Sequence, residues 1–381
     1  MNKNSQDSPK QNAAPLPPEN EPDSSRTPDG AAEPEWKVYF DGNFWSPQGQ
    51  EPAGTELRIG KQFQWAGHHW LLPAVYFCSE GLVLDLCMRV EAREIEAFME
   101  KWNLTPENAD YDRFTREQQM EIELDSPLSL EIRPALELNG RKLAFSQGCS
   151  VSYLPFLEEK YPGTEAAGGL EEKLAGRHYG LDQACGWKIY REAFLWEGSP
   201  FSKADSLLLT LDPYPNDIPG PHFTANAPGD MISFTHPADG RLYTLTVQDI
   251  SQETLDKALL EESEESLEFP LHYTVLTYTL SPEPEEDIAI TGFSGGDQPR
   301  RKPVSSDSDG SDSGGGAAAI GIIGCAVSPL ILLDSNEKQQ KLHTACSFPR
   351  FEPVKETEWS ITFHKKQFET GVFPFDVKSC G

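Results

Sequence analysis

The chain has 381 residues, and its 61 Asp and Glu residues against 32 Lys and Arg residues give a formal net charge of −29. Nucleic-acid binding by bulk electrostatics requires clustered Lys and Arg, and an anionic membrane surface repels an acidic protein. We therefore expect neither nucleic acid nor membrane as a partner. At roughly 100–200 residues per domain, the length allows about two domains.

The first 34 residues contain seven prolines and almost no large apolar side chain besides Leu16. Such a segment cannot offset the entropy lost on ordering, so we predict a disordered tail over residues 1–34. It also lacks the apolar core of a secretory signal. The seven cysteines are an odd number at irregular spacings without a Cys-x-x-Cys motif, which favours reduced thiols in the cytoplasm.

Short turns between apolar runs predict two hairpins at the start of the ordered region. One turn is Asp41-Gly42-Asn43 and the other is Ala66-Gly67. The strands that these turns would join cover residues 36–40 and 44–45 in the first hairpin, and 57–65 and 69–78 in the second. A further apolar run predicts a strand over residues 81–90.

The hydrophobic period then changes to that of a helix. Ile95, Phe98, Met99 and Trp102 follow one another at spacings of three and four residues, so they share one face of an amphipathic helix over about 92–102. Two weaker helices are predicted, and they cover residues 106–119 and 169–175.

Most later apolar segments are short and separated by Gly and Pro, which is typical of antiparallel β-structure. Strands are predicted over residues 120–124, 128–132, 142–145, 187–196, 206–211, 230–234, 242–247, 272–280, 287–293, 320–327, 331–333, 342–348 and 358–364. In the strand over 187–196, Tyr190, Phe194 and Trp196 share a face, and we expect these large rings in the core.

These elements predict a mostly β (α+β) fold of antiparallel sheets, sandwich-like or barrel-like, with one clear helix and minor ones. We place one lobe over residues 35–181 and a second over 182–381. A Gly/Ser/Asp-rich stretch over 294–316 would interrupt the second lobe as a flexible loop. The tract Asp307–Asp312 lacks the glycine and glutamate positions of a calcium loop, so we assign it to this loop.

A second apolar stretch, Ala317–Leu333, has no charge but is interrupted by glycines and Pro329, which favours buried strands over a membrane span. Its part Ile320–Leu333 resembles the I-G-I-I-G-G-A-D-G-P-T-A-I-F segment of the membrane β subunit of sodium-pumping decarboxylases. Val327 stands where that family has its ion-ligating Asp, so ion pumping is not implied. Similar copies occur in soluble, β-rich bacterial proteins of unassigned function, and the resemblance implies that kind of protein.

Candidate catalytic residues are few. Asp212 and Asp217, close to three prolines, could act as an acid and a base in a glycosidase, while His222 and His236 could assist in a cleft. The eight histidines show no metal-ligand spacing, and no phosphate-binding or dinucleotide-binding glycine motif is present. We therefore expect no metal and no cofactor.

Two functions of different classes remain open. The first is a non-enzymatic interaction or accessory protein that binds a protein partner, since an acidic surface favours basic partners and keeps a protein soluble. The alternative is a hydrolase or carbohydrate-active enzyme that uses the carboxylate pair or a histidine. A cleft that joins His222 or His236 to Asp212 or Asp217 would favour the enzyme.

Overall fold

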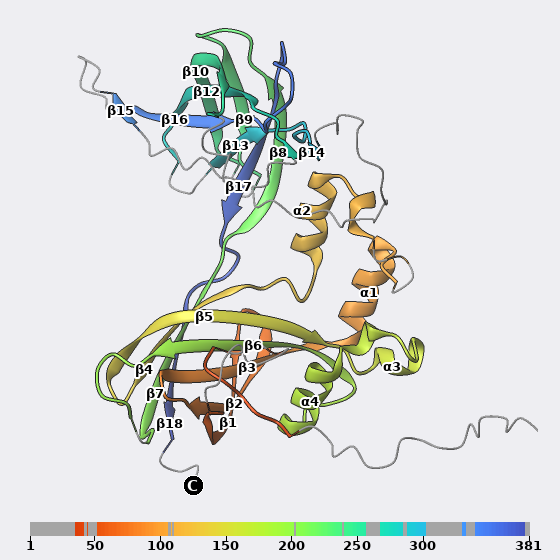
Figure 1. The fold of residues 1–381 in the computed structure, drawn as a ribbon, viewed down its shortest axis with the longest axis vertical. Coiled ribbons are helices and arrows are strands. Elements are labelled where there is room, and N and C mark those ends of the chain that lie inside the picture. Colours follow the sequence, from red (N-terminus) through yellow and green to blue (C-terminus); the bar gives the residue numbers. More distant parts are fainter. Residues whose placement is uncertain are drawn as a thin grey trace, which may run out of the picture. The chain divides into compact units, whose positions relative to one another are not determined.

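The structure is a computed structural model of the chain. It describes residues 35–41, 44, 52–105, 108, 110–201, 203–237, 240–256, 267–284, 288–301, 330–332 and 340–377. The predicted tail, the predicted strand over 320–327, and residues 302–316 of the predicted loop lie outside the described residues. The predicted fold class is confirmed, because antiparallel strands dominate the chain and helices are few (Figure 1).

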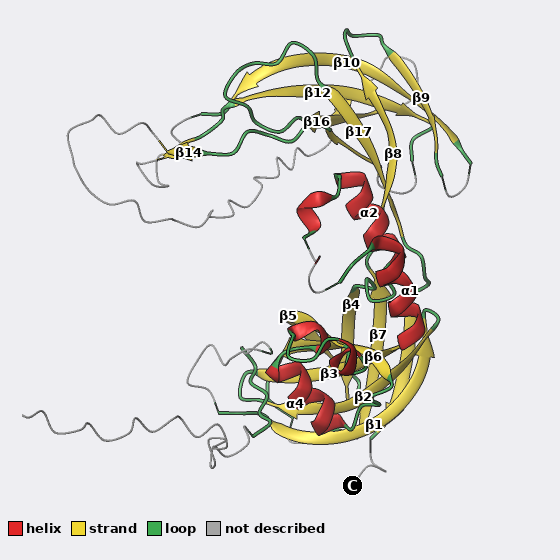
Figure 2. Ribbon diagram, turned by 90° about the vertical axis from the view of Figure 1, so that its right-hand side faces the viewer, coloured by secondary structure: helices red, strands yellow, loops and turns green. Residues whose placement is uncertain are grey.

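The largest element is an eight-stranded antiparallel sheet that curls into a nearly closed barrel (Figure 2). In order across the sheet, its strands are β1 (Thr55–Trp65), β2 (His68–Phe77), β3 (Gly81–Glu91), β6 (Cys185–Leu195), β5 (Arg141–Tyr153), β4 (Ile132–Leu138), β7 (Ser206–Pro213) and β18 (Gly371–Asp376). The outermost strands approach each other, because the ring centroids of Phe63 on β1 and Phe373 on β18 lie 4.3 Å apart.

The hairpin of β1 and β2 confirms the second predicted hairpin. Trp65 pairs with His68, so the turn consists of Ala66 and Gly67 alone. Both have positive φ, 52° for Ala66 and 78° for Gly67. Two left-handed residues give the turn a twist that matches the right-handed twist of the strands.

The central strands β3 and β6 are buried along nearly their whole length, because both of their faces are covered. Leu84 and Leu86 on β3 point into the barrel core, and Tyr190 and Phe194 on β6 join the same core, as predicted. Ile189 on β6, which alternates with these rings, is also fully buried.

Among the described residues, four α-helices and two short 3-10 helices accompany the strands. They are α1 (Ala92–Trp102), α2 (Arg116–Asp125), α3 (Leu157–Lys160), α4 (Leu170–Tyr179), η2 (Tyr111–Arg113) and η3 (Glu165–Ala167). Helix α1 has the predicted bounds, and α4 begins one residue after the start of the predicted helix over 169–175 and extends beyond its end.

Two predictions fail around α2. The segment over 120–124 is helix rather than strand, and the predicted helix over 106–119 is replaced by η2 and the first turn of α2. Thr115 explains the difference, because its side chain accepts a hydrogen bond from the backbone of Gln118 while Gln118 bonds back to the Thr115 backbone. This capping box starts a helix in which Met120, Ile122 and Leu124 alternate with glutamates only by coincidence.

Three smaller sheets form the rest of the described structure. The five-stranded sheet has the order β15 (Leu330–Leu332), β16 (Gln340–Cys346), β12 (His272–Ser281), β10 (Leu242–Thr254) and β9 (Met231–Thr235). The three-stranded sheet consists of β13 (Ile288–Gly292), β17 (Glu358–Lys365) and β8 (Asn216–Thr224), and β11 (Leu267–Glu268) pairs with β14 (Arg300–Arg301). A second apolar core, with Trp359 and Phe363 fully buried, is shared by strands of the five-stranded and three-stranded sheets.

The barrel sheet does not follow the predicted division between residues 181 and 182. Strands β6, β7 and β18 come after residue 181 but belong to the same sheet as β1–β5. Strands are predicted on both sides of residue 181, but their sequences do not indicate which strands pair with one another, and so the division was misplaced. The chain passes between the barrel sheet and the three-stranded sheet twice, after β7 and before β18.

The first strand of the first predicted hairpin, over residues 36–40, is not found in the structure. Val38 and Phe40 are nevertheless buried. Their backbone makes isolated contacts instead, such as the bond from Gly54 N to Val38 O at 2.8 Å. The apolar pattern therefore reflects burial of single side chains rather than strand pairing.

Candidate functional site

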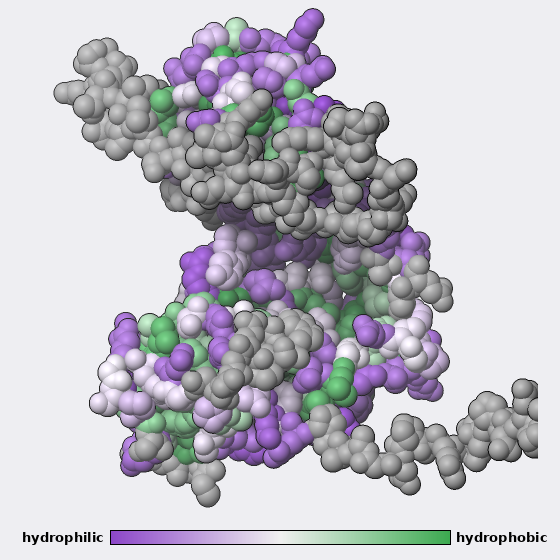
Figure 3. All heavy atoms as spheres, in the orientation of Figure 1, coloured by the Kyte–Doolittle hydropathy of each residue, from purple (hydrophilic) through white to green (hydrophobic). Residues whose placement is uncertain are grey.

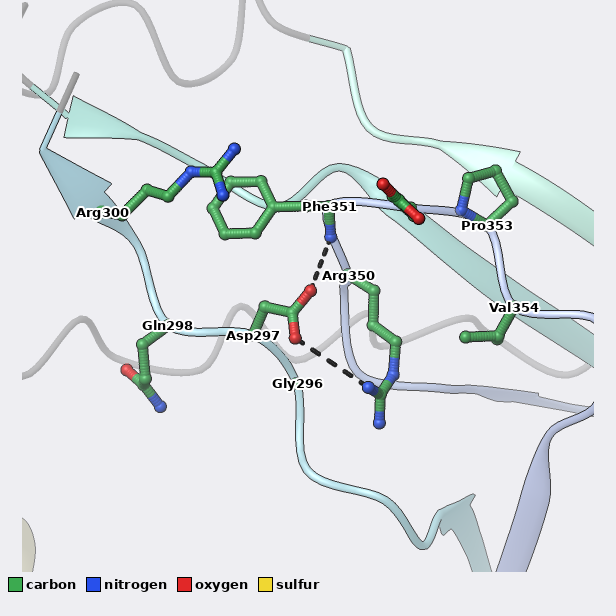
Figure 4. A pocket seen from close by; sticks show the side chains of 9 residues that line it. Gly296, Asp297, Gln298, Arg300, Arg350, Phe351, Pro353 and Val354 are labelled. Carbon is green, nitrogen blue, oxygen red and sulfur yellow. Dashed lines mark hydrogen bonds and ion pairs between the residues drawn. The ribbon is translucent and has the colours of Figure 1, made fainter. Parts of the chain in front are cut away.

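The described surface is hollowed between two extended stretches of chain, residues 294–300 and residues 347–358 (Figure 4). The larger hollow has a volume of about 680 Å³ and the smaller about 240 Å³. Both hollows are lined by Arg350 and Val354, so they adjoin each other, and we call the two together the Arg350 groove. The larger hollow is lined by Gly296, Asp297, Gln298, Arg300, Arg350, Phe351, Glu352, Pro353 and Val354.

Glycine allows the two walls of the groove to approach. A Cβ atom on Gly296 would lie 2.8 Å from the carbonyl oxygen of Pro349, so no other residue fits there without a shift. Next to it, Asp297 N donates to Pro349 O at 3.0 Å. The Asp297 carboxylate in turn accepts a hydrogen bond from Phe351 N at 2.8 Å. Residues 295–297, which belong to the predicted flexible loop over 294–316, are thus hydrogen-bonded to residues 349–351.

Arg350 ties the groove together. Its backbone N donates to His272 O at 2.8 Å, which anchors it at the start of β12. Its guanidinium crosses to the opposite wall, where Nη2 donates to Gly295 O at 2.9 Å and Nη1 lies 3.9 Å from Asp297 Oδ1. Arg350 therefore bonds the two walls of the groove to each other and anchors them to β12.

Arg300 occupies the rim. Its Nε donates to Glu268 Oε2 at 2.8 Å, and this bond raises the pKa of the guanidinium above its usual value. The guanidinium carbon lies 4.1 Å from the ring centroid of Phe351, in cation–π geometry. Arginine and aromatic side chains are enriched at the energetically important positions of protein interfaces.

His222, one of the predicted catalytic residues, lies beside the groove rather than in it. Its Nε2 is 3.4 Å from Glu117 on α2, and its Nδ1 is 3.5 Å from Glu358, which lines the smaller hollow. The imidazole also packs against Phe293 at a centroid distance of 3.9 Å. Its carboxylate neighbours are thus Glu117 and Glu358 and not the predicted partners Asp212 or Asp217.

His236 is buried in the second apolar core. Only 5% of its surface is exposed, and its ring meets that of Phe363 edge-on at 4.6 Å. Its backbone N donates to Arg241 O at 2.9 Å. The surroundings are those of a packed core histidine.

Asp212 and Asp217 lie where the chain leaves the barrel sheet, at the end of β7 and the start of β8. The Asp212 carboxylate accepts hydrogen bonds from Lys366 at 2.8 Å and from Thr370 at 2.7 Å, and these bonds lower its pKa. Asp217 accepts from His364 Nδ1 at 2.7 Å. Each predicted carboxylate is thus paired with a cationic or titratable group, Asp212 with Lys366 just after β17 and Asp217 with His364 on β17.

A charged pair beneath α4 was missed by the sequence analysis. Asp85 on β3 is completely buried and accepts two hydrogen bonds from Arg191 on β6, at 2.9 and 2.8 Å. Tyr179 on α4 donates to the same carboxylate at 2.6 Å, and its own hydroxyl lies 2.6 Å from that of Tyr76. The available signal was the presence of charged residues, Asp85 and Arg191 among them, inside two otherwise apolar strands.

Glu192, the next residue on β6, is also buried, with 4% of its surface exposed. It lies between Leu84 on β3 and Gly148 on β5, where a Cβ on residue 148 would be 2.0 Å from the Glu192 carboxylate. Burial, together with the negative charges of Glu131 and Asp85, raises the pKa of Glu192 to about 8. Its carboxyl group is therefore mostly protonated at neutral pH.

Within the part of the chain that the structure describes, no group of three or more His, Cys, Asp or Glu residues is arranged to hold a metal ion. No helix in that part has the length and apolar composition needed to cross a membrane. Comparisons with protein families, curated proteins and solved structures find no match to this chain.

Proposed function

We propose that the protein is an interaction protein that binds an extended segment of a partner protein along the Arg350 groove. The observation that carries this proposal is the shape of the groove. Two adjoining hollows share Arg350 and Val354 and run between two extended stretches of chain, an arrangement that suits a partner in extended conformation.

The lining supports the proposal chemically. Phe351, Pro353 and Val354 offer apolar surface, while charged side chains stand around them. A central apolar part with a polar rim is the usual composition of a protein interface. The pair of Arg300 and Phe351 combines an arginine with an aromatic ring, and both kinds of side chain are enriched in protein interfaces.

The walls are held before any partner arrives. Arg350, Asp297 and Gly295 are joined by hydrogen bonds and an ion pair, so the site does not have to be ordered on binding. Pre-organisation raises affinity because less conformational entropy is lost.

A selection of phage-displayed random peptides tests the proposal. Peptides selected on the wild-type protein are measured against Val354→Trp, in which an indole fills the part shared by both hollows. We expect at least a tenfold rise in Kd, which corresponds to about 1.4 kcal/mol. The control is Val372→Trp, at a 56% exposed position on β18 of the barrel sheet, a strand that contributes no residue to either hollow.

Gln298→Trp, at an exposed position of the larger hollow, repeats the test if Val354→Trp folds poorly. Circular dichroism and thermal unfolding establish that each variant is folded. Equal binding of the selected peptides to wild type and to both groove variants would refute the proposal.

A further inference from the structure

We infer that the segment bound by the Arg350 groove is basic, carrying Lys or Arg side chains along an extended backbone. This inference rests on the proposed function and adds the chemical class of the partner. We base it on the charged side chains that line the groove and on which of them already have a partner of opposite charge within the protein.

The groove lining is acidic in balance. Its carboxylates are Asp297, Glu352, Glu356 and Glu358, against the two guanidinium groups of Arg300 and Arg350. Both arginines are already paired, Arg300 with Glu268 at 2.8 Å and Arg350 with Gly295 O and Asp297. An incoming acidic segment would have to compete with these partners.

Two carboxylates remain for a partner. Glu352 and Glu356 are both exposed, and neither lies within ion-pair distance of a cation among the described residues, although the charge of Glu352 contributes to raising the pKa of Arg300. Glu352 lines the larger hollow and Glu356 the smaller, so one carboxylate stands at each part of the groove. Lys355 is exposed between them in sequence but does not line either hollow.

Apolar surface lies next to these carboxylates. Pro353 and Val354 follow Glu352 directly, and Phe351 precedes it. Lys and Arg side chains can lay their aliphatic stems on such a surface while the charged head reaches a carboxylate. The combination is therefore better suited to a long basic side chain than to a small cation.

The charge of the whole chain acts in the same direction. With a net charge of −29 the protein attracts cationic segments over a distance and repels anionic ones. Hydrophilic side chains also cover much of the described surface on the face drawn in Figure 3. The long-range attraction raises association rates, whereas Glu352 and Glu356 would decide where the segment binds.

The experiment compares two labelled peptides of equal length by fluorescence anisotropy. In one, Lys alternates with Val and Thr, and in the other Glu replaces every Lys. We expect the basic peptide to bind, its affinity to fall between roughly 50 and 200 mM salt as the charges are screened, and the acidic peptide not to bind.

The decisive variant is Glu352→Gln/Glu356→Gln, for which we expect at least a tenfold weaker affinity for the basic peptide. Its matched control is Glu94→Gln/Glu100→Gln, which removes the same charge from two exposed positions on α1 and should leave the affinity within twofold. Unchanged binding by the groove variant, equal loss in both variants, or no binding of the basic peptide would overturn the inference.

The peptides selected on phage separate this inference from the proposed function. Selected peptides that depend on the groove should carry a net positive charge. If they depend on the groove but are neutral or acidic, the partner class is wrong and the proposed function stands. If no selected peptide is sensitive to Val354→Trp and Gln298→Trp, the proposed function itself fails.

Discussion

Replacing the buried Glu192 by Gln should make the stability of the protein less sensitive to a rise in pH between about 4.5 and 8. The carboxyl group is 4% exposed, and burial is the main reason why its pKa is about 8. The negative charges of Glu131 and Asp85 add to this effect, because both disfavour a further negative charge at Glu192. Asp85 is bonded to Arg191, and Lys188 on the same strand is bonded to Glu131, so both cations are already engaged.

The size of the effect follows from the difference between the folded and unfolded pKa values. In the unfolded chain a Glu titrates near 4.5, whereas folded Glu192 titrates near 8. Between these values the unfolded chain releases its proton while the folded protein keeps it, so stability falls as pH rises, by about 1.36 kcal/mol per unit. Over the whole window the loss reaches about 5 kcal/mol at most, and glutamine does not titrate.

Urea unfolding followed by tryptophan fluorescence measures the effect at pH 5 and pH 8. Wild type should lose several kcal/mol of unfolding free energy between pH 5 and pH 8 that Glu192→Gln does not lose, because only wild type carries this proton linkage. The stability of the variant relative to wild type should therefore rise by that amount. Glu197→Gln, at an exposed position just after the same strand, is the control and should show no such increase. A constant difference between Glu192→Gln and wild type at both pH values would refute the reasoning.

Three further outcomes are expected. Arg191→Met leaves the Asp85 carboxylate buried without its cation and should lower the free energy of unfolding in urea by about 3–5 kcal/mol, whereas the double variant with Asp85→Leu should recover most of it. Gly176→Ala, which would stabilise an ordinary helix, should instead lower Tm, because its Cβ would lie 2.2 Å from Cε1 of Tyr153. Titration of denatured, freshly prepared protein should find about seven thiols per chain, since the five described cysteines form no disulfide with one another; five or fewer would contradict the predicted reducing compartment.

The elements that were predicted correctly are those determined by neighbours in the sequence. The Ala66-Gly67 turn joins its two strands directly, and the spacing of apolar residues in α1 sets both its type and its bounds. Alternation also predicted the burial of Tyr190 and Phe194. In each case the information lies within about ten residues, the range over which a turn or a helical period is determined.

The elements that were missed depend on pairing or on competing local signals. Strand β8 contains Pro219 and Pro221, which cannot donate ladder hydrogen bonds, and it is found at the edge of its sheet where this is tolerated. Strand β18, which contains Pro374, is likewise an edge strand of the barrel sheet. The pairing of β3 with β6 joins residues about one hundred positions apart, and no periodicity specifies it.

The groove shows why a site of this kind is hard to recognise in a sequence. Gly295 and Gly296 were interpreted as part of a flexible loop, since glycine-rich stretches lose much entropy on ordering. In the structure the same lack of a side chain lets Gly296 lie against Pro349, while Gly295 O accepts the hydrogen bond from Arg350. A glycine that permits close packing and a glycine that permits movement look alike in a sequence. They differ only in the segment that lies opposite, which here is contributed by residues more than fifty positions away.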